Sequence, residues 1–307
     1  SSVTENGYNI VQCTGVPTLS LVLREPEKST PKMWGAVGNQ IQDDTAALQA
    51  YFDYMESVNS ANPVVTPVAS LDNGAVYLIS SVLVAKNFGI NGNEAVFFTS
   101  GNHRIIELTG NGYIYSSFTC RYDVATSNVN REAVAITQGT SATPGVVQCS
   151  KNLFLNVVTR NAFRGFVNYG GVGFAGGMAL TEFIHCRADR SWDWGFYLQC
   201  STGTTTMTID HCHALGGASI TGSNQAKGFF VSNSSEVVCK NLVIDETSDG
   251  GAVTIIGAFI VDIDAITLES CEMVSSNSKL IDINGGAVRI GAIISKSSLY
   301  DFGAGNK

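Results

Sequence analysis

The chain has 307 residues, of which 44% are hydrophobic and only 14% are charged. Disordered chains are poor in apolar residues and rich in charge, so this composition excludes intrinsic disorder. The formal net charge of −8 argues against a nucleic-acid-binding protein. No apolar run has the length of a membrane span, and residues 1–5 lack the pattern of a signal peptide. With 32 glycines and 6 prolines, the sequence predicts a soluble, weakly charged all-β protein with many turns.

Residues 1–32 are predicted to form a neck or linker. Asp43, Asp44 and Thr45 then offer helix-capping and first-turn groups, and apolar residues follow at spacings of three and four. This pattern predicts one helix over residues 44–58. Its apolar stripe consists of Ala47, Leu48, Tyr51, Phe52, Met55 and Val58.

Beyond residue 71 the sequence changes to short β-rich runs that recur at intervals of 24 to 35 residues. Each unit contains a three-residue run whose last member we take as an inward-facing anchor. A second strand follows in each unit, and three of these strands share a Gly-Phe pair, which predicts an inward stack of rings. The anchors are Leu155, Phe183, Ile209, Ile244, Leu268 and Ile294, and the second-strand residues are Phe166, Phe196, Phe229, Val253 and Ile281.

A unit of this length cannot bury its apolar face alone, so the units must stack. Leucine-rich repeats have a similar length, but the leucine consensus and the helix in each unit are missing. A Greek-key sandwich is the alternative, although it does not explain residues that recur at a fixed phase. The repeat therefore predicts a parallel β-helix, a solenoid whose like residues stack about 4.8 Å apart.

The eight cysteines form no CxxC pair and show no zinc-finger spacing. Cys186, Cys212 and Cys271 occupy equivalent places after their anchors, and cysteine is often buried as a small apolar residue. We expect reduced thiols in the core. No fingerprint of a nucleotide or cofactor site occurs, and the prediction includes neither a cofactor nor a metal.

The segment MWGAVGNQIQDDTAALQ at residues 33–49 resembles a motif of the pectate-lyase-3-like superfamily. In that superfamily, FGAxGDGxxDDTxAxQ leads into a helix that caps a right-handed parallel β-helix. GAVYLISS at residues 74–81 is similar to the strand pair that follows. Trp34 and Asn39 replace the usual Phe and Asp, and the Pro-Gly turn of the second motif is absent. The resemblance implies an all-β, right-handed, single-stranded parallel β-helix, with the motif and a short capping α-helix in residues 33–70 and the solenoid in residues 71–307.

Within this superfamily the chain is similar to bacteriophage tailspikes, with a short neck, no signal peptide and many Ser, Thr, Asn and Gly residues. The resemblance implies a homotrimer in the virion tail that contacts other tail proteins through its N-terminal side. It also implies binding and depolymerisation of a bacterial surface polysaccharide (capsule or O-antigen), without a nucleic-acid or membrane partner. The C-terminal trimerisation region is expected to be absent. Secreted plant-wall lyases and hydrolases are the sibling class and would need export.

Depolymerisation needs either two carboxyl groups across the glycosidic bond or a base together with a group that neutralises a uronate. The residue after an inward anchor points outward. This alternation predicts one outward column of Asp210, Asp245 and Glu269 on consecutive rungs, and a solvated acidic face is the other interpretation. His211, His213 and Arg187 would lie beside the column, where a histidine base and Arg187 fit a lyase; ordinary exposed turn residues are the alternative.

The segment RADRSWDWG at residues 187–195 predicts a loop that fits a glycan groove, because aromatic rings stack on sugars while Asp and Arg bind hydroxyl or acid groups. In the alternative interpretation, the tryptophans plug and cover the rung. Hydrolysis is preferred over elimination, and a non-catalytic adhesin and a structural tail spacer are the rival functions. The candidate catalytic residues are Asp189, Asp193, Asp210, Asp245 and Glu269, and the candidate substrate-binding residues are Trp192, Trp194, Arg187, Arg190, Tyr197, His211 and His213.

Overall fold

The structure is a computed structural model that describes residues 10–12, 20–22, 29–61, 66–136, 149–169, 178, 180–200, 206–216, 227–245, 247, 251–269, 271 and 279–295. In the predicted neck, β1 (Ile10–Gln12) and β2 (Ser20–Val22) pair in antiparallel fashion. A short 3-10 helix, η2, covers Pro31–Trp34. Within the described residues, no helix has both the length and the apolar character that a membrane crossing requires.

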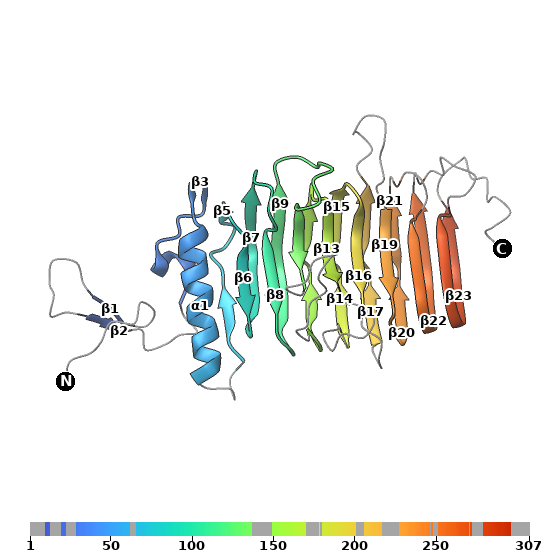
Figure 1. Ribbon diagram of the computed structural model, residues 1–307, viewed down its shortest axis with the longest axis horizontal. Helices are drawn as coiled ribbons and strands as arrows, with labels where there is room; N and C mark the ends of the chain where they lie inside the picture. Colours follow the sequence, from blue (N-terminus) through green and yellow to red (C-terminus); the bar gives the residue numbers. More distant parts are fainter. Residues whose placement is uncertain are drawn as a thin grey trace.

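The remaining strands form one sheet of 21 parallel strands that coils into a solenoid, with the rungs following one another along the long axis of the molecule (Figure 1). The predicted parallel β-helix is confirmed. The strands are β3 (Asn39–Asp43), β4 (Val68–Ser70), β5 (Val76–Leu78), β6 (Leu83–Lys86), β7 (Gly89–Thr99), β8 (Ile106–Thr109), β9 (Ile114–Tyr122), β10 (Glu132–Ala135), β11 (Leu153–Leu155), β12 (Val158–Arg160), β13 (Arg164–Tyr169), β14 (Thr181–Ile184), β15 (Arg187–Ser191), β16 (Trp194–Gln199), β17 (Thr206–Asp210), β18 (His213–Gly216), β19 (Lys227–Ser232), β20 (Glu236–Lys240), β21 (Leu242–Asp245), β22 (Val253–Glu269) and β23 (Ile281–Ser295).

The central rungs present three faces, each built from one column of paired strands. Face 1 consists of the first part of β9 with β11, β14, β17 and β20, and face 2 of the last part of β9 with β12, β15, β18 and β21. Face 3 consists of β8, β10, β13, β16 and β19. Strand β22 is long enough to pair with β19, β20 and β21 in turn.

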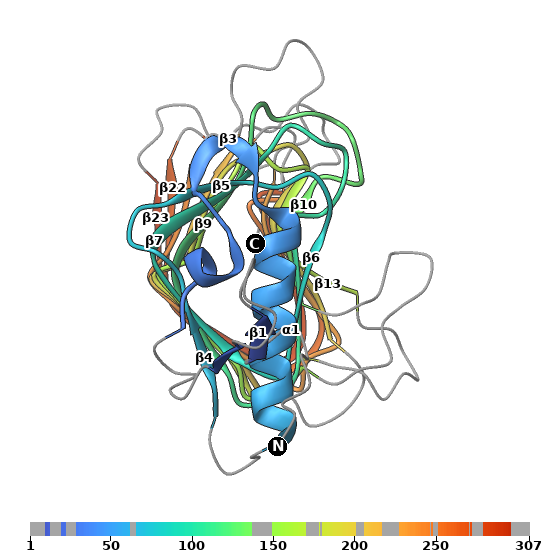
Figure 2. The ribbon, with the colours of Figure 1, turned by 90° about the vertical axis from the view of Figure 1, so that its left-hand side faces the viewer.

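The helix α1 (Thr45–Ala61) lies across the N-terminal end of the solenoid, as Figure 2 shows. Its start is fixed by Asp43, whose Oδ1 accepts a hydrogen bond from the backbone N–H of Thr45 at 3.0 Å. The buried Asp44 accepts bonds from the backbone N–H groups of Val37 at 2.7 Å and Gly38 at 3.0 Å. The predicted helix is therefore confirmed, and its acidic start ties the preceding loop to the cap.

The predicted inward stack of second-strand residues is also confirmed. Phe166, Phe196 and Phe229 pair in register, and Val253 and Ile281 continue the ladder. The ring centroids of successive phenylalanines lie 4.6 Å apart. These rings fill the solenoid, where burial of aromatic surface is a main source of stability.

The predicted alignment of anchors is wrong at three positions. Leu268 pairs with Ser295, not with Ile294. Phe154, not Leu155, pairs with Phe183, and Ile209 pairs with Cys239 instead of Ile244. Ile244 belongs to face 2, where it pairs with Leu268. Asn241 forms a corner of one residue between β20 and β21, and there the alternation shifts by one position, because Lys240 and Asn241 are both exposed and Leu242 is buried. The short apolar run that ends at Ile244 resembles a run of face 1 but belongs to face 2.

The seven cysteines in the described part of the chain are free and buried, as predicted for core thiols. Cys186 and Cys212 lie just after a corner, and their Sγ atoms lie 3.4 Å from the carbonyl oxygens of Phe154 and Phe183. Each thiol thus contacts the backbone of the preceding rung.

Candidate functional site

A pocket of about 560 Å³ opens on face 3. Its charged lining comes from Arg104 and Glu107 at β8, Glu132 at the start of β10 and Arg164 at the start of β13. Glu132 and Arg164 are direct neighbours in the parallel register. The solenoid therefore brings together side chains from three successive rungs.

The guanidinium group of Arg104 bridges two carboxylates. Its Nη1 lies 2.9 Å from Oε1 of Glu107, and its Nε lies 2.7 Å from Oε2 of Glu132. Burial alone would lower the pKa of Arg104, but the charges of Glu132 and Glu107 raise it above its ordinary value. The site thus holds a charged guanidinium between two acids, and a buried charge requires such partners.

Arg164 continues this arrangement toward the next rung. Its Nη2 lies 2.6 Å from Oδ2 of Asp193, and its Nη1 donates to the hydroxyl of Tyr169 at 2.7 Å. The Tyr169 hydroxyl in turn donates to Oε1 of Glu132. Burial, together with the charge of Glu132, raises the pKa of Tyr169, so this phenol keeps its proton. One polar network therefore links Asp193 to Glu107.

The ring of Tyr197 lies between other side chains, so it borders the pocket with its edge. The guanidinium carbon of Arg164 lies 4.1 Å from the ring centroid of Tyr197, and the ring of Phe230 stacks on Tyr197 at 4.7 Å. The Tyr197 hydroxyl accepts a hydrogen bond from Gln199 at 2.9 Å. Apolar contact in the pocket is instead offered by Val82, Val129 and Phe163.

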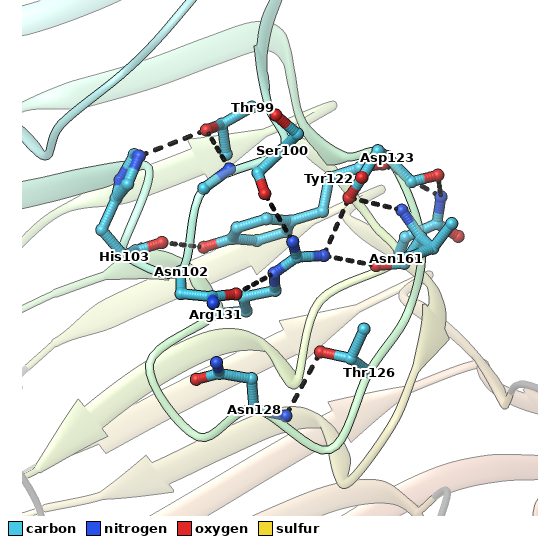
Figure 3. A network of polar contacts seen from close by, with 12 residues as sticks. Thr99, Ser100, Asn102, His103, Tyr122, Asp123, Thr126, Asn128, Arg131 and Asn161 are labelled. Carbon is cyan, nitrogen blue, oxygen red and sulfur yellow. Dashed lines mark hydrogen bonds and ion pairs between the residues drawn. The ribbon is translucent and has the colours of Figure 1, made fainter.

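The rim of the pocket is organised by the buried Arg131 (Figure 3). Its guanidinium donates to Oδ1 of Asn102 at 3.0 Å, to the carbonyl of Ser100 at 2.6 Å and to Oδ1 of Asp123 at 2.8 Å. These bonds join the loop before β8 to the loop after β9. Both loops contribute to the pocket lining, through Asn102, His103, Val129 and Asn130.

His103 is held at the rim by both ring nitrogens. Its Nδ1 donates to the carbonyl oxygen of Arg104 at 2.6 Å, because a carbonyl can only accept. In the neutral ring, Nε2 then accepts from the hydroxyl of Thr99 at 3.2 Å. The hydroxyl of Tyr122 also donates to the His103 carbonyl at 2.6 Å (Figure 3). His103 is therefore a fixed wall of the pocket.

The predicted loop over residues 187–195 is instead a strand, a corner and a strand, because β15 ends at Ser191 and β16 begins at Trp194. Asp189 and Asp193 are both only 6% exposed. Asp189 pairs with Arg187 and, at 3.1 Å, with Arg160. Both aspartates thus neutralise arginines of the preceding rung, and Asp189 also neutralises Arg187 of its own strand, a role that the spacing of charged residues did not indicate.

The tryptophans of this segment differ in exposure. Trp194 is 8% exposed and packs on Phe230, with a centroid distance of 5.4 Å, while the amine of Lys227 lies 5.1 Å from its ring. This agrees with the alternative in which a tryptophan covers the rung. Trp192 is half-buried between the two strands, and Arg190 is exposed within β15, at a break in the register where its φ is 54°.

The predicted acidic column is wrong because it joins residues of two faces. Asp210 lies on face 1, in register with Ile184 and Lys240. Asp245 and Glu269 are direct neighbours on face 2. Because Ile244 lies on face 2 and not on face 1, the residue after it, Asp245, is separated from Asp210.

The predicted histidine patch is divided by a corner. His211 takes a left-handed conformation there with φ of 51°, bonds Asp210 through Nδ1 and stacks on His185 with a centroid distance of 5.1 Å. His213 lies on face 2 in register with Arg187. Burial and the charge of Arg187 lower the pKa of His213, and its Nε2 is buried without a hydrogen bond within the described structure.

Sequence reasoning missed Arg104, Glu107, Glu132, Arg164 and Tyr169. One signal was present in the repeat: the residue before each Gly-Phe pair is Arg164, Trp194 or Lys227, a set of large side chains at one phase. The register places Trp194 directly beside Lys227. Applied to the aligned second strands, outward alternation would have identified this part of face 3.

No family model matches the sequence, and no curated protein matches it either. Among solved structures, the chain is similar to the enzymatically active domain of tailspike protein 2 from bacteriophage CBA120, with 14% identity, a TM-score of 0.53, and coverage of 95% of this chain and 46% of that chain. It is also similar to the gp42 tailspike of Acinetobacter phage vb_AbaP_AS12, with 14% identity, a TM-score of 0.54, and coverage of 87% and 49%. The chain thus spans about half the length of these tailspikes, and the likeness establishes a shared β-helix fold.

Proposed function

We propose that this protein is a phage tailspike that binds and depolymerises a bacterial surface polysaccharide, either capsule or O-antigen, at the pocket on face 3. The observation that supports this proposal most directly is a pair of carboxyl groups, Glu107 and Glu132, that share the guanidinium of Arg104 at the pocket wall. The fold shared with two phage tailspikes supports the class of protein.

The chemistry we propose is carboxyl-based hydrolysis. Of the two carboxyl groups, Glu107 is the more exposed, so we assign it the role of the general acid that supplies a proton. Glu107 then gives this proton to the glycosidic oxygen as the C–O bond breaks, and an attacking water gives its proton to Glu132. The bonds from Arg104 and Tyr169 hold the two oxygens of Glu132 in place.

The test uses Glu107→Gln and Glu132→Gln, with a panel of purified capsular and O-antigen polysaccharides and size-exclusion chromatography of the products. Each substitution should slow shortening by about 100-fold or more, because it removes an acid–base group. Asp262→Asn is the control, since Asp262 pairs with Arg289 on exposed parts of β22 and β23. Full turnover by both glutamate variants would contradict the site.

A second candidate site is the acidic pair of Asp245 and Glu269 on face 2, beside Arg187 and His213. It preserves two of the predicted catalytic acids on adjacent rungs. If Asp245→Asn and Glu269→Gln abolish shortening while the face 3 variants do not, cleavage belongs to this pair. Asp189, Asp193 and Asp210 are then best assigned as positioning residues, because each already pairs with a cation.

A lyase is the second candidate function, favoured by the arginines and tyrosines of the pocket, which could bind a uronate and donate a proton. Shortening that is accompanied by ultraviolet absorbance of unsaturated uronates would establish it. Binding without shortening would instead establish an adhesin, with Trp192, Arg190 and His211 as further contacts to test.

We also propose a homotrimer attached to other tail proteins through its N-terminal side. A cluster of exposed apolar side chains on β22, formed by Ile256, Phe259 and Ile260, supports contact with another chain. Sedimentation equilibrium should give three chains per particle, and a monomer at micromolar concentration would contradict the trimer.

A further inference from the structure

The charges of the face 3 pocket are already balanced inside the protein. Arg104 faces Glu107 and Glu132, and Arg164 faces Asp193. Among the described residues that line the pocket, Arg104 and Arg164 are the only arginines and there is no lysine. Each guanidinium group of this network therefore already has a carboxylate partner.

An anionic sugar would meet two unfavourable effects in such a pocket. Its carboxylate would lose water on binding, and the guanidinium groups that it would meet already have carboxylate partners. A neutral sugar avoids both effects. Its hydroxyl groups can donate to Glu107, and its C–H groups can contact Val82, Val129 and Phe163.

We infer that the pocket selects an uncharged sugar residue, so that the protein acts on a polysaccharide, or on a segment of one, that is free of uronates and other acidic sugars at the cleavage position. This inference rests on the proposed function and deepens it. It also bears on the reaction: β-elimination requires a uronate, so a pocket that excludes acidic sugars is suited to hydrolysis.

The test compares each acidic polysaccharide of the panel with its own carboxyl-reduced form, in which every uronate has become a neutral sugar of the same linkage. Binding is measured by isothermal titration calorimetry with Glu132→Gln, so that the ligand is not consumed; in this variant Glu107 remains the carboxylate partner of Arg104. The reduced form should bind about 10-fold more tightly or better, the effect of removing one poorly paired buried charge. Equal or tighter binding of the acidic form would overturn the inference.

A variant pair tests whether the charge of the pocket causes this preference. Val129 is 61% exposed and lines the pocket, so Val129→Lys in the Glu132→Gln background should fold and add an unbalanced cation at the rim. The preference for the reduced form should shrink several-fold, by about the effect of one nearby charge. Val124→Lys is the matched control: Val124 is 54% exposed on the same loop but lies outside the pocket lining.

The outcomes separate the inference from the proposed function. If Val129→Lys leaves the preference unchanged, or Val124→Lys reduces it equally, the charge of the pocket does not set the preference and the inference fails. If the protein shortens an acidic polysaccharide and not its reduced form, the inference fails while the proposed function stands. If no polysaccharide of the panel is bound or shortened, the proposed function fails and the inference falls with it.

Discussion

At the scale of single residues, the face 3 pocket depends on charges that are buried with their partners. The side chain of Glu132 is 4% exposed, and its two oxygens bond Arg104 and Tyr169. Such a pair contributes little net stability when it is intact, but loss of one partner leaves a buried charge without compensation. Arg104 is therefore expected to matter for folding as well as for the site.

We expect Arg104→Met to lower the free energy of unfolding by about 3 kcal/mol, because it strands the carboxylate of Glu132. Urea denaturation monitored by circular dichroism measures the change. Arg289→Met is the matched control, since the pair of Arg289 with Asp262 is exposed and its loss should leave the midpoint nearly unchanged. Equal midpoints for the two variants would contradict the structural role of Arg104.

His213 makes the free energy of unfolding depend on pH, and its lowered pKa determines the direction of that dependence. Burial and the charge of Arg187 lower its pKa below the ordinary 6.5, so the unfolded chain binds a proton more readily than the folded chain. The stabilising effect of the neutral ring is complete above pH 6.5 and is lost as the pH falls through the folded pKa.

The free energy of unfolding of His213→Gln should therefore fall less than that of the wild type between pH 7.5 and pH 5, because the variant lacks the side chain that takes up about one proton on unfolding. Urea denaturation at both pH values measures this difference, and His185→Gln, which changes an exposed histidine, is the control. Parallel pH curves for the wild type and His213→Gln would show that His213 does not titrate on unfolding.

At the scale of elements, the rungs pack so closely that a glycine is required between them. A Cβ on Gly228 would lie against the carbonyl oxygen of Ala252 on the next rung. We expect Gly228→Ala to destabilise the protein by about 1–3 kcal/mol through overpacking. Thermal denaturation should show the loss, while Thr254→Ala on the neighbouring β22 should have a smaller effect. An unchanged melting temperature for Gly228→Ala would contradict this close packing of the rungs.

The rim loops depend on Arg131, which joins them through Asn102, Ser100 and Asp123. Arg131→Lys keeps the charge but cannot reproduce this forked set of bonds. We expect faster proteolysis within residues 123–130 and about 10-fold weaker binding of the polysaccharide that the wild type shortens. Limited proteolysis with mass spectrometry measures the first effect and calorimetry the second. Unchanged cleavage and affinity would contradict a positioning role.

The elements that sequence reasoning predicted well share a strong local signal. The capping helix follows from Asp43, Asp44 and an apolar stripe, and the ladder of Phe166, Phe196 and Phe229 follows from a Gly-Phe pair at fixed phase. The face to which a strand belongs has no such signal. A corner of one residue, such as Asn241, shifts the alternation by one position, and the short apolar runs on either side of it look alike. Ile244 is therefore expected on face 1 but lies on face 2, and the predicted acidic column does not form.

At the scale of the whole molecule, the register between rungs determines which side chains meet in the pocket. Residues far apart in the sequence, such as Glu107 and Arg164, meet on face 3 because their strands are one or two rungs apart (Figure 1). Spacing marks only Arg164, at the repeated position before a Gly-Phe pair; the other charged members of the pocket lie in loops and strand starts without that signal. The sequence identified the solenoid, while the charged pocket depends on its three-dimensional register.

The most direct measurement is a crystal structure of Glu132→Gln soaked with an oligosaccharide of a polysaccharide that the wild type shortens. We expect a neutral sugar residue in the face 3 pocket, with its glycosidic oxygen within hydrogen-bond distance of Glu107 and its ring against Phe163. An oligosaccharide bound over Asp245 and Glu269 on face 2, with the face 3 pocket empty, would contradict it.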